Sequence, residues 1–237
     1  MGYGVGQFPP GHRDFGEATR VNEVLAKAHR TATAAMRAGA GSPKVGTCLQ
    51  LPVIEPLRPE SAEDTAIADM ARQFVVDFHT ADLRAGGDVG DFVGLNYYTR
   101  VVIDATSPGL VVPPGPKAET TQMNWEVYPE GLGRMLRRLV DIGLPIVVTE
   151  NGIATADDAQ RIRFLASHLR QVKDALCDGD DVRGYIYWSS FDNFELVHGY
   201  GQTFGLIGID RSNGYRRIVR PSAAVYGEIA RNGCLTS

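Results

Sequence analysis

Glu150 stands where a short apolar segment of the sequence ends. The segment contains Ile146, Val147 and Val148, and so short a run of β-branched residues is typical of a strand buried on both faces. Thr149-Glu150-Asn151-Gly152 follows it. A carboxylate at the C-terminal end of a buried parallel strand is a candidate catalytic group, because α/β barrels place their active sites there. This segment alone leaves open the alternative of a carboxylate that only faces solvent.

Polar and aromatic residues end two further predicted strands. Residues 91–98 close with Asn96, Tyr97 and Tyr98, whereas residues 182–188 close with Trp188, and Glu195 lies in the loop beyond. Because neighbouring parallel strands share one C-terminal edge, we expect these groups to converge on one pocket. Aromatic faces beside carboxylate and amide groups suit a sugar, which has apolar C–H faces and a ring of hydroxyls. Each residue alone also has a purely structural explanation; their convergence favours a binding site.

The elements that must position these groups alternate between strand and helix. The predicted strands cover residues 44–51, 91–98, 144–152 and 182–188, and the predicted helices cover residues 17–38, 61–78, 128–140, 155–176 and a last segment from 221. Each crossover is long enough for a parallel βαβ unit. Four such units form either a small open sheet or half of an eight-stranded barrel.

Three further expectations concern individual segments. Residues 52–59, which contain three prolines, are predicted to form a loop, and residues 204–210 and 216–219 are predicted to pair as a hairpin. The last helix is predicted to turn Ala224, Val225 and Ile229 inward.

Composition restricts the classes of function. The chain of 237 residues, expected to form a single domain over residues 1–237, carries a net charge of −4, so it has no basic excess for nucleic acid or an anionic membrane surface. Three cysteines without CxxC spacing argue against disulfides or a zinc site and favour a reducing, cytoplasmic setting. Neither a signal peptide nor an apolar run of membrane-spanning length is expected. No metal or other cofactor is predicted.

Three motifs in this chain closely resemble those of glycoside hydrolase family 1. They are Asp91-Phe-Val-Gly-Leu-Asn-Tyr-Tyr-Thr99, Val148-Thr-Glu-Asn-Gly152 and Gly184-Tyr-Ile-Tyr-Trp-Ser-Ser-Phe-Asp-Asn-Phe-Glu195. That family comprises retaining β-glucosidases and β-galactosidases built on a (β/α)8 barrel. The resemblance covers nearly the whole chain. It implies a parallel (βα)4 fold equivalent to the second half of a TIM barrel, and retaining hydrolysis of O-glycosidic bonds in a β-glycoside.

The resemblance also implies a role for each candidate residue. Glu150 corresponds to the catalytic nucleophile that forms a covalent glycosyl-enzyme, and Tyr98 to the tyrosine that orients it. The residues that correspond to substrate-binding positions are Asn96 beside the nucleophile, Trp125 on the aglycone side, Trp188 under the sugar and Glu195 at its outer hydroxyls.

The sequence lacks part of the family's pattern. Retaining hydrolysis uses two carboxyl groups about 5 to 5.5 Å apart, but the Thr-x-Asn-Glu-Pro motif that carries the acid/base residue occurs nowhere in this chain. Leu196 replaces the tryptophan that follows the sugar-binding glutamate in the family, and the connector at residues 85–90 is much shorter. These two differences weaken the expectation for recognition of the sugar.

Half a barrel is expected to need a partner, because its first and last strands are open edges. Two copies of the chain could pair, a separate chain could supply the first four units, or the sequence could be the C-terminal part of a longer polypeptide. An alternative function is a catalytically silent sugar-binding or assembly module. A third possibility is a non-functional remnant, which would be aggregated or molten when expressed alone.

Overall fold

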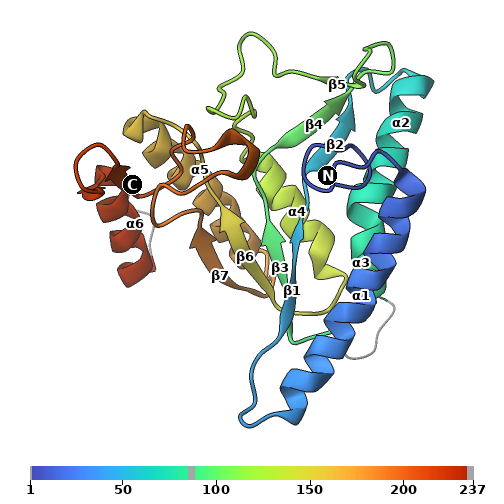
Figure 1. Ribbon diagram of the computed structural model, residues 1–237, viewed down its shortest axis with the longest axis horizontal. Coiled ribbons are helices and arrows are strands. Elements are labelled where there is room, and N and C mark those ends of the chain that lie inside the picture. The colour runs from blue at the N-terminus through green and yellow to red at the C-terminus, as the bar shows by residue number, and fades with distance from the viewer. Residues whose placement is uncertain (1, 85–88, 234–237) are drawn as a thin grey trace.

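The computed structural model describes residues 2–84 and 89–233 (Figure 1). Residues 85–88 of the predicted Gly-rich connector, and Cys234, lie outside the described residues.

Four parallel strands form the central sheet. They are β1 (Gly46–Gln50), β3 (Phe92–Asn96), β6 (Ile146–Asn151) and β7 (Val182–Tyr187), and they lie in the order β1-β3-β6-β7. Their spatial order follows their order in the chain, as in a (β/α)8 barrel, whereas a doubly wound sheet reverses its order at a switch point. The prediction of an α/β fold with a parallel sheet is therefore confirmed, and the barrel-like alternative is the one observed.

The helices agree closely with the predicted ranges. They are α1 (Phe15–Ala38), α2 (Ala62–Arg72), the π-helical turn η1 (Gln73–Asp77), α3 (Phe78–Arg84), α4 (Glu130–Val140), α5 (Asp158–Cys177) and α6 (Pro221–Asn232). Side-chain caps explain where two of them begin: Asp14 accepts a hydrogen bond from the Glu17 amide, and Asp157 accepts one from the Ala159 amide.

In the described part of the chain, the core lies on one face of the sheet. Val93, Leu95, Ile146 and Val148 are buried there, and α4 packs against them with Leu132, Leu136 and Leu139. Figure 1 shows α4 and α5 behind the strands. On the opposite face, Gly94 lies between Cys48 and Thr149, and Cys48 is exposed. Ile186, one residue after the core residue Tyr185, is 54% exposed. This second face corresponds to the interior of a closed barrel.

The prediction of a loop at residues 52–59 is wrong. Val53–Pro56 form strand β2, which pairs with β4 (Arg100–Ile103), and β4 pairs with β5 (Val111–Val112). Burial of Val53 and Ile54 outweighs the local effect of the prolines, and Pro56 stands at the end of the strand. Arg100 of β4 pairs with Glu55 of β2 at 2.8 Å within this small sheet, and with Glu126 outside its strands at 2.7 Å.

The predicted hairpin is confirmed as β8 (Ile207–Asp210) paired antiparallel with β9 (Arg216–Val219). The predicted inward face of the last helix is partly wrong. Ile229 packs inward, but its companions are Ala223 and Tyr226, whereas Ala224 is exposed. Two polar contacts fix the rotation of α6: Ser222 bonds to Asp158, and the Tyr226 hydroxyl donates to the Tyr185 carbonyl at 3.1 Å.

Helix α1 leaves much of its apolar surface uncovered by the described part of the chain. Only Ala18 and Thr33 of its 24 residues are buried, while Val24, Leu25 and Met36 are exposed. The helix is attached along one side, where Phe15 packs on Phe74 and the His29 ring bonds to the Val89 carbonyl. None of the described helices has the length and apolar composition needed to cross a membrane.

Candidate active site

Glu150 and Tyr98 meet at the C-terminal edge of the sheet. The pairing of β3 with β6 places Asn96 opposite Glu150 and leaves Tyr98 just beyond the strand end. The Tyr98 hydroxyl donates a hydrogen bond of 2.8 Å to Glu150 Oε2. Burial raises the pKa of Tyr98, and the negative charge of Glu150 raises it further. The phenol therefore stays protonated at neutral pH and remains a donor to the carboxylate.

The Tyr98 ring contacts two aromatic side chains. The Trp125 ring lies 5.5 Å from it with an interplanar angle of 55°, and the Phe204 ring lies 6.3 Å away in an edge-on arrangement. Thr121 fixes the turn that carries Trp125, because its hydroxyl oxygen accepts a hydrogen bond from the Trp125 amide at 3.2 Å. Trp125 thus packs on the tyrosine that bonds the candidate nucleophile, while its place on the aglycone side stays a prediction. The contact of Phe204 with Tyr98 was not predicted from the sequence.

Asn96 ends β3 and Asn151 ends β6, and their side chains lie on opposite faces of the sheet. The Thr149 hydroxyl donates to Asn96 Oδ1 at 2.6 Å, so this amide lies on the open face beside the candidate nucleophile. Asn151 is fully buried; its Nδ2 donates to the Tyr97 carbonyl at 2.7 Å, and its Oδ1 accepts from the Tyr185 hydroxyl at 2.8 Å. Asn151 therefore ties the end of β6 to both neighbouring strands and positions Glu150.

Trp188 follows β7 and is half-buried. Its amide donates to the Asn151 carbonyl at 3.0 Å, and its peptide bond to Ser189 is cis. A Cβ atom at Gly152 would lie 1.9 Å from the Trp188 carbonyl oxygen, so only glycine permits this approach of the two backbones. Gly152 thus allows the Trp188 backbone to lie against the end of the strand that carries Glu150.

Glu195 lies in the loop after β7, just before the short 3-10 helix η2 (Leu196–His198). Partial burial raises its pKa; His198 opposes this shift, whereas the negative charge of Glu150 adds to it. The charge of Glu150 therefore acts on Glu195 across one edge of the sheet. Leu196, which replaces the family's tryptophan, has φ of 42° and is 61% exposed.

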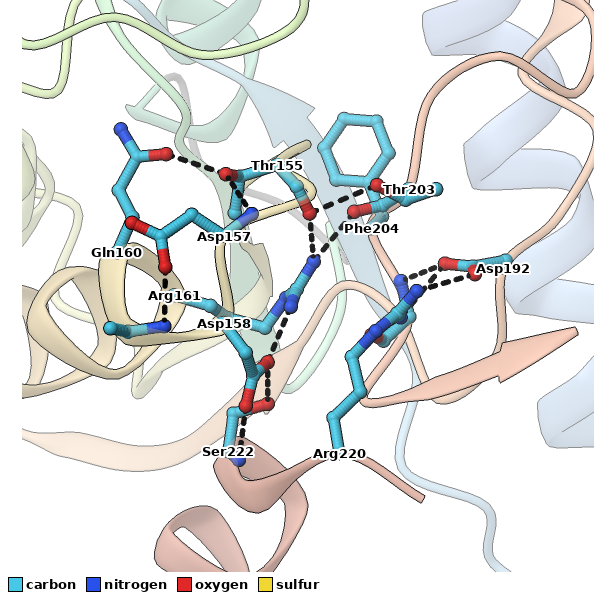
Figure 2. A network of polar contacts seen from close by, with 12 residues as sticks. Thr155, Asp157, Asp158, Gln160, Arg161, Asp192, Thr203, Phe204, Arg220 and Ser222 are labelled. Atoms are coloured by element: carbon cyan, nitrogen blue, oxygen red, sulfur yellow. Dashed lines mark hydrogen bonds and ion pairs between the residues drawn. The ribbon is translucent and has the colours of Figure 1, made fainter. Parts of the chain in front are cut away.

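A buried arginine network supports this edge, and sequence reasoning missed it (Figure 2). Arg161 is fully buried and donates to the carbonyl oxygens of Thr155 at 2.5 Å and Thr203 at 2.8 Å. It also pairs with Asp158, whose carboxylate accepts hydrogen bonds from the amide and hydroxyl of Ser222. One sequence signal was available: Arg161 lies four residues before Leu165, on the apolar side of its helix.

Among residues 2–84 and 89–233, no group of three or more histidine, cysteine or acidic side chains is arranged to hold a metal ion. Cys48 and Cys177 are free thiols.

The family model for glycosyl hydrolase family 1 matches residues 1–88 and 76–234. The chain belongs to glycosyl hydrolase family 1. The two matched ranges overlap at residues 76–88, which include part of the connector that is short in this sequence. Recognition of the family from its three motifs is thereby confirmed.

Relatives within family 1 span more than this chain. The chain is 34% identical to a β-galactosidase of Saccharolobus solfataricus over 97% of its own length and 51% of the relative's. It is 29% identical to β-glucosidase A of Thermotoga maritima, covering 99% of this chain and 61% of that one. The structure superposes on a β-glycosidase from Pyrococcus horikoshii with a TM-score of 0.91 and 35% identity, covering 100% of this chain and 59% of that chain. The chain therefore matches about half of a TIM-barrel glycosidase.

Proposed function

We propose that this chain is the nucleophile-bearing half of a retaining β-glycosidase. Glu150 attacks the anomeric carbon of a β-glycoside, the bond to the aglycone oxygen breaks, and a covalent glycosyl-enzyme forms. Water then attacks the anomeric carbon and releases the sugar and Glu150. The observation that carries the proposal is the 2.8 Å hydrogen bond from Tyr98 to Glu150, which holds the carboxylate in a fixed orientation at the sheet edge.

The proposed substrate is a β-glycoside of glucose or galactose. Asn96 and Glu195 would bond the sugar hydroxyls, the Trp188 ring would stack on the sugar's C–H face, and Trp125 would line the aglycone side. The relatives support this class of substrate, because they are a β-galactosidase and a β-glucosidase.

The acid/base carboxylate is proposed to come from a complementary half-barrel. Within the described part of the chain, β1 and β7 each have one neighbour in the parallel sheet. The side chains of Cys48 and Ile186 remain exposed on the face that a closed barrel would cover. A second copy, a separate chain or a preceding part of one polypeptide would each complete the barrel, and a non-identical half would bring the missing carboxylate.

Covalent labelling tests the nucleophile without the acid. A 2,4-dinitrophenyl 2-deoxy-2-fluoro-β-glucoside has a leaving group that departs with little protonation, so wild-type chain is expected to gain one fluoroglucosyl group on the peptide containing Glu150. Intact-protein and peptide mass spectrometry would measure it. Glu150→Gln should remain unlabelled, and Glu119→Gln, which changes an exposed carboxylate, should label as wild type does. Absence of label on folded wild-type protein would refute the proposal.

A sugar-binding module without catalysis is the second candidate. It is favoured by the absence of the Thr-x-Asn-Glu-Pro acid/base motif from this sequence. Glucose or galactose binding that survives in Glu150→Gln, without any labelling of wild type, would select this function.

A further inference from the structure

We propose that the ion pair between Arg220 and Asp192 is a positioning pair for the candidate active site. The inference rests on the proposed function, because it assigns the pair a role in orienting Tyr98, and through it Glu150. The side-chain hydrogen bonds of Arg220 and Asp192 go to each other and to Gly205, so any effect of the pair on the Glu150 carboxylate is indirect.

The pair is bidentate and largely removed from solvent. Arg220 donates to both carboxylate oxygens of Asp192, at 3.0 and 2.8 Å, and the two side chains are only 19% and 5% exposed. The planar guanidinium matches a carboxylate in this two-point geometry, which a lysine ammonium cannot reproduce. The pair therefore fixes the loop after β7 relative to the residue that precedes α6.

The same pair also forms hydrogen bonds with the backbone of Gly205. The Gly205 amide donates to Asp192 Oδ1 at 2.9 Å, and Arg220 donates to the Gly205 carbonyl. A Cβ atom at Gly205 would lie 2.3 Å from the Asp192 amide nitrogen, so the two segments are in direct backbone contact. Both peptide groups of one residue are thus held by one ion pair.

Gly205 directly follows Phe204, the residue that packs edge-on against Tyr98. Phe204 is buried, and its carbonyl accepts a hydrogen bond of 3.1 Å from the Tyr187 hydroxyl. On its other side, Thr203 is held by Arg161 and by the Thr155 carbonyl at 2.9 Å. Figure 2 shows Arg161 bonded to Thr203 and Arg220 bonded to Asp192. The segment that supports the Tyr98 ring is therefore fixed on both sides of Phe204.

Asp192 is also three residues from Glu195 in the same loop. Displacing the carboxylate of Asp192 would move the base of the loop that carries Glu195. One buried pair thus connects the support of the candidate nucleophile to the candidate sugar-binding carboxylate.

Arg220→Lys tests the pair, because it keeps the charge and removes the two-point geometry. The matched control is Arg183→Lys: Arg183 makes a similar bidentate pair with Asp181, at 2.7 and 2.8 Å, but exposed and at the N-terminal end of β7. Far-UV circular dichroism and urea unfolding would establish that both variants fold.

Two readouts are expected to separate positioning from stability. The rate of fluoroglucosyl labelling of Glu150 should fall about 10- to 100-fold in Arg220→Lys, since small misplacements of a reacting group cost rate steeply. In a Trp188→Phe background, Trp125 is the remaining tryptophan, and Arg220→Lys should shift its emission because Tyr98 moves beneath it. Arg183→Lys should change neither readout.

A folded Arg220→Lys protein with wild-type labelling and unchanged Trp125 emission would overturn the positioning role. If wild type does not label, the proposed function fails, and the Trp125 emission alone then tests the pair. A shift in Arg220→Lys would show that the pair holds Tyr98 in place, and an unchanged emission would show that it does not.

Discussion

The Tyr98 hydroxyl and the Glu150 carboxylate are joined by a 2.8 Å hydrogen bond between the ends of two adjacent strands. One carboxylate oxygen of Glu150 is held in this way, and the Tyr98 ring in turn packs against Trp125 and Phe204. Residues from three separate segments of the chain therefore fix one side chain. Such rigidity at a strand end is what a nucleophile requires, because its attack depends on direction as well as distance.

Tyr98→Phe tests this relationship directly. Removing the hydroxyl leaves the ring and its packing in place but frees one carboxylate oxygen of Glu150. The rate of fluoroglucosyl labelling is expected to fall roughly 10- to 100-fold, the cost of a lost hydrogen bond to a charged group and of poorer orientation. Stopped time courses followed by mass spectrometry would give the rate. Equal rates for the variant and wild type would show that the hydrogen bond has no part in aiming Glu150.

Gly152→Ala is expected to separate the ends of β6 and β7. The added methyl group meets backbone at 1.9 Å, so the Trp188 carbonyl must move. The free energy of unfolding should fall by about 1–3 kcal/mol, the usual cost of overpacking. Urea unfolding would measure it. Gly109→Ala is the control, because a Cβ there meets nothing within 4 Å; equal stability losses in both variants would refute this reading of Gly152.

The buried ring of His168 is expected to make the free energy of unfolding depend on pH. The ring is fully buried and stacked on Phe164, and burial lowers its pKa from 6.5 to about 3. Between these values the unfolded chain binds a proton that the folded chain does not. The free energy of unfolding therefore rises with pH through this window, by up to about 1.4 kcal/mol per pH unit from this group.

Urea unfolding of wild type and His168→Leu at pH 4.5 and pH 6.5 would test this expectation. The variant should lose much of the difference between the two pH values. His79→Leu offers a comparison, because burial lowers the pKa of the partly buried His79 too, and its effect should be smaller. An unchanged pH dependence in His168→Leu would contradict the prediction.

Ile186→Asp tests the open face of the sheet. Ile186 is 54% exposed in β7, and a charge there should oppose association with a second half-barrel. We expect wild-type chain purified alone to associate, and Ile186→Asp to shift it toward monomer in light scattering coupled to gel filtration. Ile218→Asp, at a 46% exposed isoleucine of β9, should leave the mass unchanged. A folded, active wild-type monomer would exclude the need for a partner.

The elements around the site were predictable because their signals are local. The β-branched run before Glu150 and the polar ends of β3 and β7 led to the parallel sheet, and motif resemblance brought Tyr98 and Glu150 together. The 2.8 Å hydrogen bond agrees with that pairing, while the chemical role of each residue stays a prediction.

The supporting contacts were not predictable because they join distant segments. Thr203 and Phe204 owe their importance to where the chain returns after β7, and nothing in their local sequence records it. Arg161 lies on the apolar side of its helix, but that position does not reveal that Thr203 is its partner. Strand β2 was missed for a similar reason: its prolines suggest a loop, and only burial against α2 and pairing with β4 make it a strand. The rotation of α6 likewise depends on Ser222 meeting Asp158.

Asn151 and Gly152 form an Asn-Gly pair whose rate of deamidation depends on folding. In an open chain, an asparagine followed by glycine deamidates readily, because no side chain hinders attack of the next amide nitrogen on the carboxamide. In the folded chain Asn151 has no exposed surface, and both ends of its carboxamide are engaged, by Tyr97 and Tyr185. Each opening of these strand ends therefore risks converting this amide to a further carboxylate beside Glu150, so deamidation at the candidate active site is limited by how often the strand ends separate.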